Sequence, residues 1–426
     1  MVAVAHAQAP RVAIITGVVG NVVEWYDFSV YGYFAPIIAG LFFPSRDPFA
    51  SLLATFAVFA VGFVMRPVGA VLFGHYGDRA GRRNALAATV ILMAAGTALI
   101  GVLPTYAQAG VLAPALLVAA RLLQGLSAGG EWGGSTSFLV EYAPESRRGF
   151  IGSWQQFSTA FGLLLGSGLG FLLTSTFSQD ALQAWGWRLP FLVGSLVGII
   201  GLYMRLRIEE TPKFRAIEKA GEVARSPLLE TLRMYPREIL AALGFTLLWT
   251  VSYYVFLTFM PTYLSSVLKV PLSQAFLSNT LGLLFFIGLI PVMGAISDRL
   301  GRKPLLILSA IGFAVLTYPL FAVISQGVFL LILVAQLAFG FLEALYSGPG
   351  PAAIAEIFPT RVRYSALSIG YNVAVAAFGG TAPFIATYVI AQTGNNLSPT
   401  IYVVLSALIT LVVLLRIKET HQQPLR

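Results

Sequence analysis

The sequence predicts an all-α polytopic membrane protein with twelve transmembrane helices in two pseudo-symmetric halves of six. Three observations predict this fold: an apolar composition, twelve apolar stretches of membrane-spanning length and an internal repeat. Hydrophobic residues make up 57% of the 426 residues and charged residues 11%, with a mean hydropathy of +0.80. Soluble domains are about 45–50% apolar and about 25% charged. The composition therefore excludes an ordinary soluble protein and a disordered chain.

The apolar stretches are long enough to cross a bilayer, since a spanning helix needs about 20 mostly apolar residues. Several are longer, which indicates tilted or bent helices. The first is too long for the apolar core of a signal peptide. The predicted spans are residues 12–42, 50–76, 84–104, 110–142, 148–176, 187–206, 238–266, 272–297, 304–325, 328–356, 363–392 and 398–416.

The basic residues predict the orientation of the chain. With a cytoplasmic N-terminus, nearly all Lys and Arg residues fall in cytoplasmic segments, and the opposite side receives only Arg46, Arg188 and Lys269. Positive residues are concentrated in cytoplasmic loops of membrane proteins. We therefore expect both termini in the cytoplasm. This distribution also explains the net charge of +9 without a nucleic-acid partner.

Two short patterns recur about half a chain apart. The stretch Gly74–Arg83, which contains Asp78-Arg79, recurs as Gly294–Lys303. The stretch Glu141–Pro144, followed by Arg148, recurs as Glu356–Pro359, followed by Arg363. Parallel repeats of six helices are typical of transporters, with the substrate bound near the middle of the membrane between them. We therefore expect an N-terminal half at 1–206, a cytoplasmic linker at 207–237 and a C-terminal half at 238–426.

The doubled pattern Gly-x-x-x-Asp-Arg-x-Gly-Arg-Arg/Lys resembles the signature of the major facilitator superfamily. Further stretches resemble its metabolite:proton symporter family, namely residues 20–28, 65–67, 121–131, 149–155 and 185–191. The resemblance implies proton-coupled uptake by alternating access in a bacterial-type inner membrane. Substrates of that family include citrate, 2-oxoglutarate, shikimate-like acids, and proline or betaine.

Charged residues inside the predicted spans are the main candidates for chemistry. A charge at the bilayer centre costs about 2.5–3.5 kcal/mol on insertion scales, so it is paired or functional. Glu24 and Asp27 share one face of the first span. Two neighbouring carboxylates in a partly dry site resist joint ionisation, so one holds a proton. We expect proton coupling at Asp27 first, then Glu24, then Glu131.

Arginine suits a carboxylate substrate, because its planar guanidinium binds carboxylates in a bidentate fashion. Arg66 and Arg121 lie within spans, so we expect a small organic anion, a di- or tricarboxylate such as citrate or 2-oxoglutarate. Further candidates for the substrate cavity are polar or acidic residues in the spans: Tyr31, Gln155, Gln156, Glu343, Tyr371 and Asn372.

Gating residues are expected at the cytoplasmic helix ends, where acids and arginines hold neighbouring helices together. The candidates are the repeated motif residues Asp78, Arg79, Arg82, Asp298, Arg299, Arg302, Glu141 and Glu356. The positive-inside rule by itself also accounts for the basic residues in these motifs.

Enzyme and metal chemistry are not expected. Gly125-Leu126-Ser127-Ala128-Gly129 matches a nucleophile-elbow pattern, but that motif needs a strand-to-helix turn and a partner histidine. Gly125 and Gly129 instead suit close helix packing. The chain has no cysteine and only three histidines, which lie far apart in the sequence. We expect no metal or cofactor other than the coupling protons, the lipid bilayer as surroundings, and a functional monomer.

Other functions remain open alternatives to carboxylate uptake. One is import of a shikimate-like acid or of betaine or proline, although the best-known betaine importer has an extended C-terminal coiled coil. Another is an exporter or drug:proton antiporter, which usually carries a Gly- and Pro-containing motif on the fifth helix, and 148–176 has no proline. The last alternative is a transport-inactive receptor or a channel.

Overall fold

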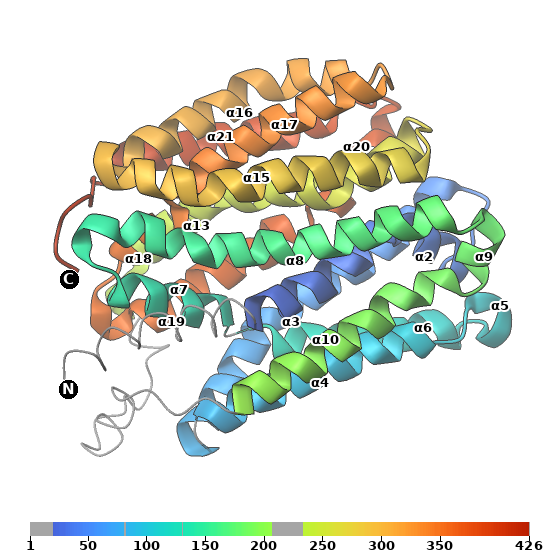
Figure 1. The fold of residues 1–426 in the computed structure, drawn as a ribbon, viewed down its shortest axis with the longest axis horizontal. Helices are drawn as coiled ribbons and strands as arrows, with labels where there is room; N and C mark the ends of the chain where they lie inside the picture. Colours follow the sequence, from blue (N-terminus) through green and yellow to red (C-terminus); the bar gives the residue numbers. More distant parts are fainter. Residues whose placement is uncertain (1–19, 81, 130, 207–232, 426) are drawn as a thin grey trace.

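The structure is a computed structural model that describes residues 20–80, 82–129, 131–206 and 233–425 (Figure 1). Within these ranges the chain forms helices joined by short turns, and no strand occurs. Nine helices in this part of the chain are long and apolar enough to cross a membrane. The shorter apolar helices at Ala88–Val102 and Gly186–Ile199, with helical residues 20–42, correspond to the remaining predicted spans.

The helix boundaries agree with the predicted spans to within a few residues wherever they are described. The first span consists of residues 20–33 and α2 (Ala35–Phe42), joined at Phe34. The other helices of the N-terminal half are α3 (Pro48–Ala80), α4 (Arg82–Val102), α5 (Tyr106–Ala109), α6 (Leu112–Ser127), α7 (Glu131–Tyr142), α8 (Arg148–Thr176), α9 (Gln179–Ala184) and α10 (Leu189–Leu206). Short 3₁₀ turns η1 (Glu145–Arg147) and η2 (Gly186–Arg188) precede α8 and α10.

Two spans of the C-terminal half contain π-helical turns. Its helices are α13 (Pro236–Tyr253), α14 (Met260–Thr262), α15 (Leu272–Leu300), α16 (Arg302–Ile324), α17 (Phe329–Ser347), α18 (Gly350–Glu356), α19 (Thr360–Ala374), α20 (Ala382–Thr393) and α21 (Pro399–Arg416). The π-helical turns are η3 (Tyr254–Phe259), η4 (Tyr263–Val267) and η5 (Val375–Gly379). Such turns are frequent at functional sites.

The helices from the two parts of the sequence occupy different sides of the bundle (Figure 1). α4, α6 and α10 lie on one side, α16, α17 and α21 on the other, and α8 packs along α15 between them. This arrangement agrees with the prediction of two six-helix halves. Residues 207–232 of the predicted linker lie outside the described residues, so the proposed domain boundaries remain predictions.

Close helix packing explains the glycines of the apparent nucleophile elbow. A Cβ at Gly125 would lie 2.0 Å from the carbonyl oxygen of Gly62, and one at Gly129 would lie 2.2 Å from that of Arg66. No side chain fits at such distances. The pattern therefore lets α6 and the chain after it lie directly against α3, as small residues do in membrane helix pairs.

Candidate functional site

A small cavity lies where the two halves meet. It is lined by residues of the first span, α8, α13, η3 and α19. All lining residues are buried. They are Trp25, Gln156, Trp249, Thr250, Tyr253, Tyr254 and Tyr371.

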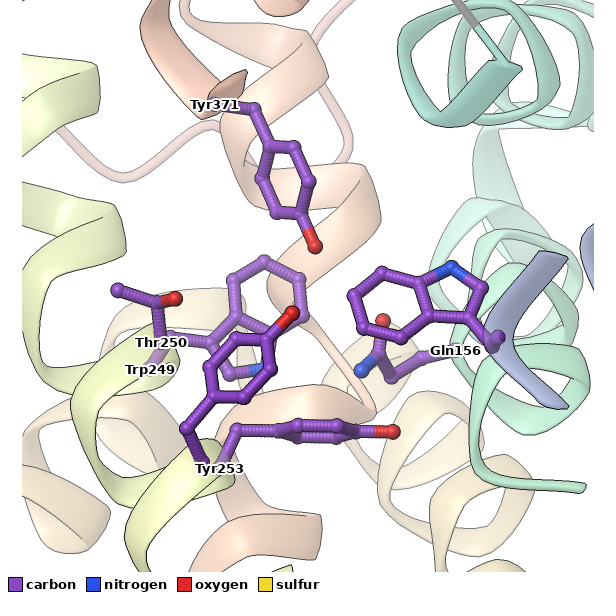
Figure 2. Close-up of a pocket in the computed structure, with 7 residues that line it drawn as sticks. Gln156, Trp249, Thr250, Tyr253 and Tyr371 are labelled. Carbon is purple, nitrogen blue, oxygen red and sulfur yellow. The ribbon is translucent and has the colours of Figure 1, made fainter. Parts of the chain in front are cut away.

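Aromatic rings form most of the cavity wall. Trp25 faces the ring of Tyr253 edge-on at 6.0 Å, and Trp249 faces that of Tyr371 at 6.4 Å. Trp132 stacks behind Tyr371, with the ring centroids 3.6 Å apart. In Figure 2, the Tyr371 hydroxyl points into the space between Gln156, Trp249 and Tyr253. Rings arranged in this way present electron-rich faces, which bind quaternary and other organic cations.

Among the described residues, those that line the cavity offer hydrogen-bonding groups but no charge. The Tyr253 and Tyr254 hydroxyls, the Thr250 hydroxyl and the Trp25 indole nitrogen have no hydrogen-bond partner in the described part of the chain. The same is true of the Gln156 side-chain oxygen. Thr250 and Gln156 approach the cavity from opposite sides (Figure 2). The wall therefore suits a small ligand that combines a cationic group with hydrogen-bond acceptors.

An ion pair lies directly behind one wall of the cavity. Arg66 Nη2 donates to Glu24 Oε1, and both side chains are buried. The Arg66 guanidinium lies 5.4 Å from the Trp25 ring centre and 5.1 Å from that of Phe28. Arg66 Nε and Nη1 have no partner among the described residues. Arg66 is thus charge-compensated and still has free donor groups.

A second polar chain runs through the N-terminal half. Arg121 Nη1 donates to Gln124 Oε1 at 2.8 Å, and Gln124 Nε2 donates to Thr97 Oγ1 at 2.8 Å. The Thr97 side chain lies beside Asp27, whose oxygens have no hydrogen bond of standard geometry in the described residues. The Arg121 guanidinium stacks 4.5 Å from the Tyr31 ring centre. Asp27 and Arg121, both fully buried, are therefore linked through two polar side chains rather than by direct contact.

The other predicted cavity residues separate into two groups. Gln156 and Tyr371 line the cavity, whereas Tyr31, Gln155 and Asn372 do not. Tyr31 donates to the Thr55 carbonyl at 3.1 Å, and Asn372 donates to the Gly129 carbonyl at 2.6 Å. These two side chains hold helices together in this structure.

Of the remaining predicted acids, Glu343 does not line the cavity, and the side chain of Glu131 is not among those that the structure describes. Glu343 is buried on α17 and contacts the hydroxyl of Ser252 at 2.7 Å. It does not line the cavity. The side chain of Glu131 lies outside the described residues, although its backbone begins α7.

Ion pairs join the two halves at the end of the bundle where residues 417–425 lie, called the tail end below. The repeated Glu/Arg motifs pair crosswise: Arg363 Nη1 donates to Glu141 at 2.8 Å, and Arg148 Nη1 donates to Glu356 at 3.0 Å. Each acid thus binds the arginine of the other repeat. Arg148 and Arg363 were not among the predicted gating residues.

Asp298 joins the halves at the same end. Its carboxylate accepts from the backbone N–H groups of Gly149 at 2.7 Å and Phe150 at 2.8 Å, at the N-terminus of α8. An anion is favoured there by the helix dipole. Arg302 Nη1 also donates to Asp298 at 2.7 Å, whereas Arg299 is exposed. The side chains of Asp78, Arg79 and Arg82 lie outside the description.

Contacts between the halves also close the opposite end. The Tyr33 hydroxyl donates to the Leu257 carbonyl at 2.8 Å, and the Phe34 and Phe276 rings lie 5.8 Å apart. The cavity is therefore enclosed between two sets of contacts, one at each end of the bundle.

Most of the aromatic wall was not predicted, although the sequence contains a signal for it. Glu24 aligns with Trp249 in the repeat, so the neighbouring Trp25 and Thr250 occupy matching positions in the first and seventh spans. Tyr253 and Tyr254 follow one turn later. The signal was the pair of tryptophans, Trp25 and Trp249, one position apart in the two repeats, whereas the predicted site rested mainly on charged residues.

Comparison with known proteins identifies the family. Residues 12–238 match the family model described as Sugar (and other) transporter, and residues 272–426 match that of the Major Facilitator Superfamily. The chain belongs to the major facilitator superfamily. The predicted membership is thereby confirmed, as is the expectation of a multi-pass membrane transporter rather than an enzyme.

Relatives at higher identity carry more specific names. The glycine betaine/proline/ectoine/pipecolic acid transporter OusA of Dickeya dadantii is 37% identical, over 98% of this chain and 85% of that protein. The proline/betaine transporter of Escherichia coli K12 is 36% identical over the same shares. A putative proline/betaine transporter of Staphylococcus aureus is 33% identical, over 96% of this chain and 88% of its own. These names do not mention a di- or tricarboxylate.

A solved structure supports the fold. The xylose transporter XylE from E. coli, in a partially occluded inward-open conformation, superposes with a TM-score of 0.78. The sequences are 20% identical, and the match covers 96% of this chain and 98% of the other. The predicted major facilitator fold, with its twelve spans, is therefore confirmed.

Proposed function

We propose that this protein takes up a small zwitterion with a substituted ammonium group, such as glycine betaine or proline, by proton-coupled alternating access. The observation that carries the proposal is the uncharged aromatic cavity. Ring faces attract an organic cation by about 2 kcal/mol or more when the site is desolvated. The names of the relatives support the same substrate class.

The cavity argues against the di- or tricarboxylate expected from the sequence. Burying several negative charges is very costly unless cations compensate them. Among the described residues, those that line the cavity provide none. The neighbouring Arg66 is already balanced by Glu24. A substrate without net charge is therefore the better match. The alternative predicted from the sequence, import of betaine or proline, replaces the predicted uptake of a di- or tricarboxylate.

The two ends of a zwitterion have separate partners in this proposal. The ammonium group packs against the rings of Trp25, Trp249 and Tyr253. The carboxylate accepts from hydroxyl groups such as those of Tyr254 and Thr250, which lack partners in the described residues. The free Arg66 nitrogens behind Trp25 attract the same end of the substrate.

Proton coupling is assigned to Asp27, with Glu24 and Glu131 as the other candidates. Asp27 is buried and lacks a direct cation partner in the described residues, whereas Glu24 is bound to Arg66. An unpaired buried carboxylate holds a proton more readily than a paired one. Movement of one charge through 100 mV supplies about 2.3 kcal/mol for accumulation.

Alternating access requires the contacts at the two ends to break in turn. We propose that the tail end faces the cytoplasm of a bacterial-type cell, as the basic residues predict. Opening to that side then breaks the crossed pairs Glu141–Arg363 and Arg148–Glu356, together with the Asp298 contacts to α8. Function as a monomer remains part of the proposal.

Calorimetric binding to the purified protein tests the substrate class. Glycine betaine and proline should bind, whereas succinate and citrate should not compete. Choline, which keeps the cation and lacks the carboxylate, should bind more weakly than betaine. Tight binding of citrate with no binding of betaine would refute the proposal.

A further inference from the structure

Glu343 is a buried carboxyl group to which the proposed function assigns no role. It lies on α17, is 1% exposed, and has no Lys or Arg nitrogen within 4.0 Å in the described part of the chain. Its described polar neighbours are the hydroxyls of Ser252 at 2.7 Å and Ser347 at 3.5 Å. The titratable groups that face it are the hydroxyls of Tyr253 on α13 and Tyr346 on α17.

The hydrogen atoms around Ser252 indicate the state of this carboxyl group. Ser252 Oγ lies 2.8 Å from the Leu248 carbonyl oxygen and 2.7 Å from Glu343 Oε2. A serine hydroxyl has one hydrogen, and a carbonyl oxygen cannot donate. The one hydroxyl hydrogen can lie along only one of these two short contacts. If Ser252 donates to Leu248, a hydrogen bond in the other contact requires a hydrogen on Glu343.

Glu343 is also connected to the cavity wall. The Trp249 indole nitrogen donates to Ser347 Oγ at 2.8 Å, and the Ser347 hydroxyl is directed at Glu343 Oε1. Trp249 forms part of the aromatic wall. The chain Trp249–Ser347–Glu343 therefore joins the position of one cavity ring to the carboxyl group. Ser252 belongs to the same helix as Trp249 and Tyr253, so the contact between Ser252 and Glu343 supports the same part of the cavity wall.

We propose that Glu343 is a second proton-binding residue, in the half opposite Asp27, and that its protonated form positions Trp249 for substrate binding. In the closed structure, Glu343 is neutral because ionisation would leave a buried charge without a cation. When the halves separate and water reaches α17, the carboxyl ionises and its hydrogen bonds rearrange. Release of the proton then loosens the Trp249 wall. The positioning role rests on the proposed function, but the protonation state does not.

Infrared difference spectroscopy at neutral pH tests the protonation state without any substrate. Relative to wild type, Glu343→Gln should lose intensity in the C=O stretching band of a protonated carboxyl group. The matched control Glu145→Gln removes an exposed glutamate and should lose intensity in the carboxylate bands instead. Loss of carboxylate intensity in Glu343→Gln would overturn the proposal.

A second variant keeps the proposal testable if Glu343→Gln does not fold. Ser252→Ala leaves the carboxyl group in place and removes its short hydrogen bond, so the protonated-carboxyl band should shift in frequency. An unchanged spectrum would contradict the assigned contact.

Betaine binding as a function of pH tests the positioning role. The wild-type affinity should fall as alkaline pH removes the proton, whereas Glu343→Gln should keep its affinity across the same range. An identical fall in both proteins would overturn this role. If the wild type binds neither betaine nor proline, the proposed function fails, while the infrared result still decides the state of Glu343.

Discussion

Removal of one cavity ring should weaken betaine binding through the loss of a cation–π contact. Trp25 is suited to this test because its indole nitrogen has no partner in the described residues, so Trp25→Leu breaks no hydrogen bond there. Trp25 is 2% exposed, and it lies within 6.0 Å of Tyr253 and 6.3 Å of Tyr254. One desolvated ring face contributes about 2 kcal/mol. Its loss should weaken binding roughly 30-fold.

The assay compares betaine with 3,3-dimethylbutyrate, which has the same shape and carboxylate but carbon in place of the charged nitrogen. Calorimetry should show a large loss for betaine in Trp25→Leu and only a small loss for the analogue that lacks the cationic nitrogen. Trp185→Leu is the matched control, because Trp185 is 48% exposed and does not line the cavity. Equal losses of affinity for the two ligands in Trp25→Leu would refute the cation–π argument. Equal affinities of the wild type for betaine and 3,3-dimethylbutyrate would also refute it.

Three further predictions concern protons, gating and the tail. Asp27→Asn should abolish uptake driven by an inward proton gradient but preserve substrate counterflow; continued accumulation against a gradient would exclude Asp27 as the carrier. Asp298→Asn should slow exchange between access states, measured by counterflow rates, and leave affinity nearly unchanged; a tenfold loss of affinity, about 1.4 kcal/mol, would place it in the site. Burial disfavours ionisation of Glu419, but backbone N–H groups at Lys303, His421, Arg302 and Thr420 hold its pKa below the ordinary value. Its ionised form therefore stabilises the packing of residues 417–425 against the bundle at pH values above the unfolded pKa of about 4.3. This packing should weaken as pH falls through the lower pKa of the folded protein, so limited proteolysis of 417–425 should increase there. Unchanged proteolysis would contradict the prediction.

The fold was largely predictable because hydropathy determines where helices cross a bilayer. The stretch predicted at 148–176 is the helix Arg148–Thr176, for example. The interruptions were not predicted. The π-helical turn at Tyr254–Phe259 and the break at Ala128 change the direction of side chains without changing the average hydropathy. The π-helical turn contains Tyr254, one of the cavity rings.

The site was only partly predictable, because sequence shows which charges exist and not which of them compensate one another. Arg66 suggested an anionic substrate, but the structure pairs it with Glu24. The same applies at the tail end, where Glu141 binds Arg363 of the other repeat rather than the arginine of its own motif. Tertiary pairing therefore changed the expected substrate from an anion to a zwitterion.

Uptake into proteoliposomes tests the central claim most directly. Purified protein is reconstituted, an inward proton gradient is imposed, and the internal concentrations of radiolabelled betaine, proline, succinate and citrate are followed. Betaine or proline should accumulate above the external concentration, and the accumulation should collapse when a protonophore is added. Gradient-driven accumulation of citrate or succinate, without betaine or proline, would contradict it.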